Sequence, residues 1–175
     1  MTGKRPLPPL DDGSLRELAL RYVGRFATSR AKLLAYLSRK LQERGWDGED
    51  PPQPERLVER LGELRYVDDA SYAAMKSASL ARRGYGARRV AEKLRADGIA
   101  DADREEADNH TQNESWAAAE RFARRKRLGP FATERPDPKQ REKWIAAFLR
   151  AGHSYTTARR WTDAAPGEVP EREEG

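Results

Sequence analysis

Residues 80–90 carry arginines on both sides of a Gly-Tyr-Gly turn, a combination of residue types suited to binding an anion. The four arginines, in pairs before and after the turn, are Arg82, Arg83, Arg88 and Arg89. An arginine guanidinium is planar and permanently charged, and its N–H groups match pairs of phosphate or carboxylate oxygens. Tyr85, at the centre of the turn, adds an aromatic ring that could stack on a ligand. The segment therefore predicts a site for phosphate or carboxylate groups.

The same basic composition recurs at two other places, residues 21–30 and 121–127. The three basic segments, together with Lys93 just after the second one, give the candidate partner-binding residues, which are Arg25, Arg30, Arg82, Arg83, Tyr85, Arg88, Arg89, Lys93, Arg124, Arg125, Lys126 and Arg127. Runs of charge more often form solvated faces, so a solvated helix junction whose tyrosine fills the local core is the alternative. The recurrence favours a binding surface.

Acidic segments separate the basic ones along the chain. Residues 14–44 hold eight basic and two acidic side chains, whereas residues 47–69 hold three basic and eight acidic. Residues 76–95 are basic again, and residues 97–108 are acidic. If each segment is a helix of a repeating array, the array should present a basic ribbon and an acidic ribbon.

The chain lacks the residue patterns of an enzyme or a metal site. There is no Ser/His/Asp order, no phosphate-binding loop and no zinc spacing, and no cysteine is present. Asp68 and Asp69 directly precede a helical segment and are expected to cap it. His110 is expected in a polar linker and His153 just beyond a helix end. We therefore expect no catalytic residue, metal or cofactor.

Composition limits the fold and the location. The 175 residues are 37% hydrophobic and 36% charged, with a net charge of +5, which suits an elongated array of small shared cores better than one large core. No apolar run approaches the ~20 residues that a membrane helix needs, and no signal peptide is evident. A cytoplasmic, monomeric protein that does not enter a membrane is expected.

Three glycines indicate a structural repeat. Gly45, Gly98 and Gly152 each end a helical pattern, at intervals of about 53 residues, the length of a three-helix unit. Each glycine suits the left-handed position after a helix. The residue pairs expected to close these helix ends are Leu41 with Trp46, Leu94 with Ile99, and Phe148 with His153. Three similar helix ends predict one module used three times.

Helix starts and apolar spacing support nine helices and no strand. Capping boxes are expected at Ser14 with Glu17 and at Thr111 with Glu114, and single caps at Ser29 and Asp137. The expected helices begin near residue 14 and span 30–44, 54–65, 69–82, 87–97, 101–108, 116–127, 138–150 and 155–164. Leu57, Val58, Leu61 and Leu64 are the expected buried face of residues 54–65. Trp116, Trp144 and Trp161 are expected in the core, and Trp46 partly exposed.

The predicted fold is therefore all-α. Residues 1–13 are expected to form a flexible tail, and residues 14–66, 67–109 and 110–165 three tandem three-helix, helix-turn-helix-like repeats. Residues 128–135 are expected to form a long loop, and residues 166–175 a disordered acidic tail.

Several of these segments resemble the RecX family of regulatory proteins. The resemblance covers roughly residues 15–165 and is strongest in Tyr66-Val67-Asp68-Asp69-Ala70-Ser71-Tyr72-Ala73, residues 82–90 and residues 94–99. It implies three repeats in a curved rod that binds the RecA recombinase–DNA filament and modulates its activities, usually as an inhibitor, in recombination, DNA repair and the SOS response. One departure is Ala87, where the family often has proline.

Direct, largely sequence-nonspecific DNA binding by the helix-turn-helix-like repeats is the alternative function. A basic face alone supports binding of this kind, with a strong dependence on salt. Asn and Gln side chains, which commonly read base edges, are scarce on the basic segments, which argues against sequence-specific recognition.

Overall fold

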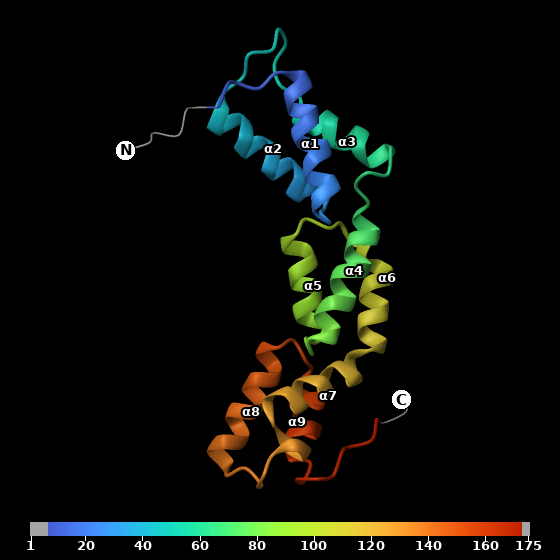
Figure 1. The fold of residues 1–175 in the computed structure, drawn as a ribbon. Helices are drawn as coiled ribbons and strands as arrows, with labels where there is room; N and C mark the ends of the chain where they lie inside the picture. The colour runs from blue at the N-terminus through green and yellow to red at the C-terminus, as the bar shows by residue number, and fades with distance from the viewer. Residues whose placement is uncertain (1–6, 173–175) are drawn as a thin grey trace, which may run out of the picture. The chain divides into compact units, whose positions relative to one another are not determined.

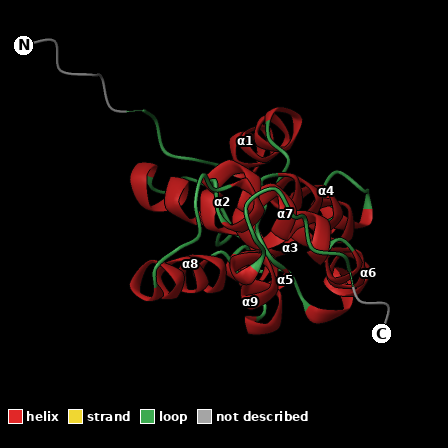
Figure 2. Ribbon diagram, turned by 90° about the horizontal axis from the view of Figure 1, so that it is seen from below, coloured by secondary structure: helices red, strands yellow, loops and turns green. Residues whose placement is uncertain are grey.

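The computed structural model describes residues 7–172, and every regular element in that range is helical (Figure 2). The nine α-helices of the described residues are α1 Asp12–Arg25, α2 Arg30–Arg44, α3 Pro54–Glu63, α4 Asp69–Arg82, α5 Ala87–Ala96, α6 Asp101–Asn113, α7 Ser115–Lys126, α8 Pro138–Arg150 and α9 Tyr155–Asp163. A short 3₁₀ helix, η1, spans Gly129–Phe131. The all-α prediction is confirmed. None of the described helices is long and apolar enough to cross a membrane.

The chain divides into two compact units. The first unit contains Met1–Tyr72 and Asp97–Ile99, and the second contains Ala73–Ala96 and Ala100–Gly175. Helices α1, α2 and α3 belong to the first unit, and α5 to α9 belong to the second (Figure 1). Helix α4 begins in the first unit and continues in the second.

The core of the first unit comes from helical spacing on three helices. The buried residues at its centre are Leu15 and Ala19 of α1, Leu33 and Leu37 of α2, and Val58 and Leu61 of α3. Leu10, which is fully buried, joins this core from outside the helices. Its amide donates to the carbonyl of Gly45 and its carbonyl accepts from the amide of Asp47. The expectation of a flexible tail up to residue 13 is therefore wrong from Leu10 onward, and residues 1–6 lie outside the described residues.

Helix α1 begins earlier than expected because Asp11, and not Ser14, is its cap. The Asp11 carboxylate accepts from the amide of Ser14, and the Ser14 hydroxyl accepts from the amide of Asp11. A capping box is thus present, with Ser14 in its third position and Glu17 outside it. The expected caps Ser29 and Asp137 are confirmed, since each accepts from the amide three residues on.

Two helices end at arginines with left-handed backbone. Arg65 has φ of 62° and Arg127 has φ of 54°. After α3, the amide of Tyr66 donates to the carbonyl of Leu61 and that of Arg65 to Gly62, which is the hydrogen-bond pattern of a Schellman motif. Helix α3 therefore stops at Glu63 and not near residue 65. Leu64, expected to be buried, is 50% exposed.

The glycines that follow the second helix of each repeat have the left-handed backbone that the sequence predicted. Gly45, Gly98 and Gly152 all have positive φ. At Gly152 the amide of His153 donates to the carbonyl of Phe148, so the expected Schellman motif is confirmed there. At Gly45 the glycine amide donates to Leu41, a simpler form of helix end that does not use Trp46.

Helix α6 is longer than expected and does not end before residue 110. It continues to Asn113, so the expected capping box at Thr111 is wrong and His110 is helical. The Thr111 hydroxyl donates to the carbonyl of Ala107 inside the helix. Arg104 lies on the buried face of α6, with 7% of its surface exposed. Its guanidinium forms ion pairs with Asp101 and Asp108. Residues 109 and 110, between which the second and third repeats were expected to meet, both lie inside α6.

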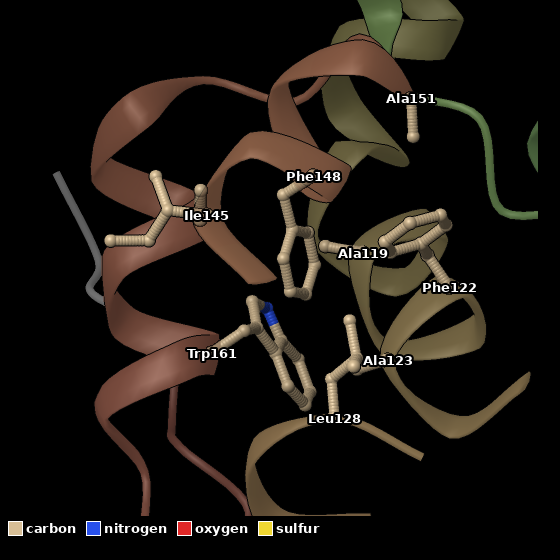
Figure 3. Packing of buried hydrophobic residues seen from close by; sticks show 9 residues of the cluster. Ala119, Phe122, Ala123, Leu128, Ile145, Phe148, Ala151 and Trp161 are labelled. Atoms are coloured by element: carbon tan, nitrogen blue, oxygen red, sulfur yellow. The ribbon is translucent and has the colours of Figure 1, made fainter. Parts of the chain in front are cut away.

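Aromatic residues fill the core shared by α7, α8 and α9 (Figure 3). Trp161 and Phe148 are fully buried, and the ring of Phe122 lies 4.9 Å from that of Phe148. Trp116 packs against this core at its edge, 5.2 Å from Trp161, and Trp144 is also partly buried. The expectation that these tryptophans belong to the core is confirmed. Trp46 is likewise only partly buried.

The segments flanking this core are more ordered than expected. The loop at residues 128–135 contains η1, and Gly129 lies so close to the Trp161 carbonyl that a Cβ would be 1.8 Å from its oxygen. The amide of Gly167 donates to the carbonyl of Pro130, and Arg160 donates to the carbonyl of Glu171. The expectation of a disordered C-terminal tail is therefore wrong up to residue 172, and residues 173–175 lie outside the described residues.

Candidate basic binding site

The turn between α4 and α5 is built by glycines that let it lie against other helices of the second unit. Gly84 has φ of +81°, and a Cβ on it would lie 2.8 Å from the backbone nitrogen of Phe122 in α7. Its amide donates to Ala81, and the next amide, of Tyr85, donates to Leu80. These two bonds close α4 in a Schellman motif and bring its end onto α7.

The other side of the same turn lies against the junction of α8 and α9. A Cβ on Gly86 would lie 2.4 Å from the carbonyl carbon of Gly152. The amide of Gly86 donates to Ala151, and the amide of Arg88 donates to Gly152. Free amides at the start of α5 are thus satisfied by carbonyls just after the end of α8, an arrangement that also aligns opposite ends of two helix dipoles. The turn is fixed by backbone contacts and not only by side chains.

His153 adds a buried polar contact to this junction. Its Nε2 lies 3.0 Å from the carbonyl oxygen of Gly84, and the residue is 4% exposed. Burial lowers the pKa of His153 to about 4, although the hydrogen bond to Gly84 opposes the shift. His153 is therefore neutral at pH 7 and serves the turn.

Tyr85 lies beside two guanidinium groups. The Cζ of Arg83 is 5.4 Å and that of Arg125 is 5.9 Å from the centre of the Tyr85 ring, both within cation–π range. Arg125 also donates to the carbonyl of Arg83. The structure thus brings together three of the candidate residues, two from the turn after α4 and one from α7.

Arg121 has a related structural role that the candidate set omitted. It donates to the carbonyl of Ala81 over 3.4 Å and pairs with Glu114 over 3.7 Å. With Arg125 it satisfies terminal carbonyls of α4, where cations also favour the helix dipole. Nothing in the sequence distinguished Arg121 from its neighbours, because the contact depends on how α7 packs against α4.

Three candidate side chains at the ends of α4 and α7 are exposed, and we call them open cations because no other described residue pairs with them. Arg82 is the last residue of α4, and Lys126 and Arg127 end α7. Their side chains make no hydrogen bond or ion pair with another residue in the range 7–172. Because no acidic side chain compensates their charge, these three cations are available to an anionic partner.

The arginines after the turn are exposed but already engaged. Arg88 and Arg89 lie 3.8 and 3.5 Å from the carboxylate of Glu92, and Arg88 also donates to the carbonyl of Leu149. Lys93 lies on the exposed side of α5. These contacts give Arg88 a structural role in holding α5 to α8.

Arg124, on α7, also has partners within the second unit. It pairs with Glu120 over 2.8 Å, and its guanidinium lies 4.3 Å from the centre of the Phe131 ring. Arg124 thus helps hold η1 against α7.

Arg25 and Arg30 belong to the first unit. Both are exposed, with Arg25 at the end of α1 and Arg30 at the start of α2. The guanidinium of Arg25 lies 5.4 Å from the centre of the Phe26 ring. That of Arg30 lies over Gly62, where a Cβ would be 2.7 Å from its Nε.

Of the two aspartates expected to cap α4, Asp68 accepts a hydrogen bond within α4 and Asp69 accepts one from α2. Asp68 accepts from the amide of Ser71, and this hydrogen bond lowers the pKa of the Asp68 carboxyl. Asp69, at 8% exposure, accepts from the backbone amide of Arg30 and so satisfies a free amide of α2. Neither arrangement suggests metal binding, and no cluster of three or more potential ligands occurs within residues 7–172.

A buried polar group in the first unit was not foreseen. The hydroxyl of Tyr72 donates to the carboxylate of Asp97 over 2.7 Å, and Lys32 lies 3.7 Å from the same carboxylate. Burial, followed by the contact with Asp97, raises the pKa of Tyr72 above its usual value. The hydroxyl of Ser29 donates to the Asp97 carbonyl. These residues lie far apart in the sequence, so no spacing pattern could predict that they are in contact.

The sequence is similar to those of known proteins over most of its length. Residues 68–107 match the family model described as RecX, second three-helix domain. The chain is 34% identical over 161 residues to the regulatory protein RecX of Myxococcus xanthus, covering 87% of this chain and 86% of the relative. It is 30% identical over 116 residues to the regulatory protein RecX of Halorhodospira halophila, covering 66% and 67%.

Solved structures agree in fold. The crystal structure of RecX from Lactobacillus salivarius superposes with a TM-score of 0.59 at 20% identity, covering 83% of this chain and 90% of that one. A second crystal structure, of a regulatory protein RecX, gives a TM-score of 0.60 at 18% identity, covering 86% and 73%. At these identities the structures support the fold alone.

Proposed function

Since this chain belongs to the RecX family of regulatory proteins, we propose that it binds the RecA recombinase–DNA filament and inhibits its ATP hydrolysis and strand exchange. It would act in the cytoplasm, as a monomer, in recombination, DNA repair and the SOS response. The relatives carry the name of regulatory proteins, and the role proposed here needs no catalytic activity of this chain.

The observation that carries the proposal beyond family membership is the set of open cations at the ends of α4 and α7. Arg82, Lys126 and Arg127 have no acidic partner within the described residues and stand close in sequence to Arg83 and Arg125. A recombinase filament on DNA offers phosphates and acidic side chains, which guanidinium groups bind with charge-assisted hydrogen bonds. The glycine turn supports this use for Arg82, because the hydrogen bonds of the turn fix the backbone next to it and so reduce the conformational entropy lost on binding.

The remaining candidate residues are proposed to contribute less. Arg88, Arg89 and Arg124 already pair with carboxylates, and an anion would have to compete with Glu92 or Glu120. Lys93, Arg25 and Arg30 are exposed and are proposed as peripheral contacts. Tyr85 is proposed to hold the two guanidiniums at its ring faces, with its edge toward the partner.

The test is a titration of this protein into the cognate recombinase assembled on single-stranded DNA. Both ATP hydrolysis and strand exchange should fall as the protein is added. If both rates stay unchanged when this protein is in large excess over the filament, the proposal is wrong.

The alternative function, nonspecific binding to duplex DNA by the repeats alone, is favoured by the same open cations. A duplex titration without recombinase separates the two. Tight duplex binding together with no effect on recombinase that is pre-assembled on DNA would favour the alternative.

A further inference from the structure

Three aromatic rings form a continuous cluster in the first unit, and two of them pack against its aliphatic core. The rings of Tyr22 and Tyr36 stack at 4.2 Å between centres with 21° between their planes. Phe26 continues the cluster, 5.2 Å from Tyr22. Tyr22 lies on α1, Phe26 is the residue that follows α1, and Tyr36 lies on α2.

The outermost ring is held where a ligand can reach it. Phe26 follows α1 in extended backbone, with φ of −129°, and its amide donates to the carbonyl of Tyr22. It is 49% exposed, although burying a phenylalanine ring would favour folding. Tyr22 and Tyr36 are partly buried against the core of the unit, so the cluster has a fixed base and an open end.

Cations lie over the same rings. The Cζ of Arg25 is 5.4 Å from the centre of the Phe26 ring. Over Tyr36, the Cζ of Arg39 is at 5.7 Å and the Nζ of Lys40 at 5.9 Å. All three are within cation–π range. Each end of the aromatic cluster is therefore bordered by positive charge.

Acidic groups do not balance this charge. Glu43 alone pairs with both Arg39, over 3.5 Å, and Lys40, over 2.5 Å. Arg25 and its neighbour one turn earlier, Arg21, form no ion pair with any residue of the described chain, and both are exposed. The surroundings of the rings thus keep a net positive charge.

We propose that this aromatic face, made of Tyr22, Phe26 and Tyr36 with Arg25, Arg39 and Lys40, binds single-stranded DNA directly. Proteins bind single strands by stacking bases on aromatic rings while cations follow the phosphates, and the face combines both features. The bases of a duplex are stacked on each other, so a half-exposed ring cannot reach their planes. The ligand class is therefore a strand with unpaired bases.

This binding does not require the recombinase, because the rings and the cations of the aromatic face all belong to this chain; the two proposals share only Arg25, a peripheral contact in the first. The test accordingly omits recombinase. Its failure would leave the filament titration unaffected, and failure of that titration would leave this proposal standing.

The first measurement is fluorescence anisotropy of a labelled oligothymidine of about 20 nucleotides, a length that spans the usual site of a single-strand binding module. Phe26→Leu keeps an apolar side chain but removes the ring, and it should weaken binding about tenfold, within the range for losing one stacked base. Tyr66→Leu is the matched control, since Tyr66 is a 58% exposed aromatic residue of the same unit with no cation over its ring among the described residues. It should bind as the unchanged protein does.

A second pair of variants tests the charge. Arg25→Gln should weaken binding about fivefold and make the affinity less dependent on salt, as expected when one phosphate contact is lost. Arg56→Gln, an exposed position on α3 without a partner among the described residues, should change neither quantity. Thermal melts of all four variants establish that each is folded.

Crosslinking gives a readout that does not depend on any variant. An oligonucleotide carrying 5-iodouracil, irradiated in complex with the unchanged protein, should attach to Tyr22, Phe26 or Tyr36. The proposal is overturned if the crosslink maps elsewhere, if Phe26→Leu binds as tightly as Tyr66→Leu, or if a hairpin duplex of equal charge binds as tightly as the single strand. Absence of binding at low salt would also overturn it.

Discussion

The imidazole of His153 donates a hydrogen bond to the carbonyl oxygen of Gly84, 69 positions earlier in the chain, over 3.0 Å. A carbonyl only accepts, so Nε2 carries the proton, and the neutral ring has an unprotonated Nδ1. The rings of Phe122 and Phe148 lie 5.6 and 5.5 Å away. This contact joins the end of α4 to the end of α8 in surroundings that disfavour a charged imidazole.

Stability of the second unit should consequently fall in mild acid. Burial lowers the pKa of His153 from 6.5 to about 4, so the unfolded chain takes up a proton at a higher pH than the folded one. Stability is fully present above pH 6.5 and is lost as the pH falls toward 4, at up to about 1.4 kcal/mol per pH unit. Urea denaturation at several pH values between these limits measures the slope.

His110 provides the control, because it is the other histidine of the chain and is exposed. His110→Gln should keep the slope between pH 6.5 and 4.5, and His153→Gln should remove most of it. Carboxyl groups with lowered pKa, such as Asp11 and Asp68, lose their contribution at lower pH still. Equal slopes in the two variants would show that His153 is not the group responsible.

Gly86 should be intolerant of a side chain. A Cβ would lie 2.4 Å from the carbonyl carbon and oxygen of Gly152, both backbone atoms that cannot rotate away. Gly86→Ala should destabilise the protein by roughly 1–3 kcal/mol, the usual range for overpacking. Gly24→Ala is the reverse case: it lies inside α1 with nothing within 4 Å of its Cβ position. That change should stabilise by about 0.5–1 kcal/mol through helix propensity. Thermal melting of both variants decides, and a harmless Gly86→Ala would contradict the packing.

Local helix signals were readable from the sequence because they depend on neighbours in the chain. Ser29, Asp137 and Pro54 begin their helices as expected, and Gly152 ends one as expected. The helix end at Arg65 could not be predicted from the sequence, since a residue other than glycine rarely takes left-handed backbone.

The sequence predicted which charged residues lie at the candidate site, but not which other residues each of them contacts. Spacing placed Arg82 and Arg88 at helix ends, and both are exposed. That Arg88 is held by the carbonyl of Leu149, whereas Arg82 is open, depends on which helix lies opposite. The link between Tyr72 and Asp97 was likewise invisible, because a buried tyrosine and a buried aspartate 25 residues apart have no shared pattern.

Tyr85 should contribute to both stability and binding. Its ring, partly buried, has Arg83 at 5.4 Å and Arg125 at 5.9 Å. Tyr85→Ala removes the packing and both cation–π contacts, so it should lower the melting temperature and weaken filament binding. Tyr85→Phe keeps the ring and should leave both close to those of the unchanged protein, because cation–π attraction needs only the ring face. If Tyr85→Phe is as damaging as Tyr85→Ala, the hydroxyl and not the ring is what matters.

The sequence predicts that replacing Arg82, Arg83, Arg88 and Arg89 together with alanine weakens filament binding much more than folding. The contacts of Arg88 limit this expectation to the pair Arg82 and Arg83. Arg82 and Arg83 are exposed, and losing each side chain should change stability by less than ~0.5 kcal/mol. Their double variant should bind the filament at least tenfold more weakly, because each charge-assisted hydrogen bond contributes about 1.5–3 kcal/mol. Where the contact is a phosphate, the salt slope should also fall by about one per arginine.

The Arg88 and Arg89 pair should behave in the opposite way. Arg88→Ala removes a hydrogen bond to Leu149 and an ion pair with Glu92, so the double variant should melt at a lower temperature. Its filament affinity should fall less than that of the first pair, because Glu92 already neutralises part of its charge. Melting and filament binding measured on both double variants distinguish these outcomes. If the first pair binds as tightly as the unchanged protein with the same salt slope, the arginines before the turn are a solvated face, and the proposed binding surface must lie elsewhere on the chain.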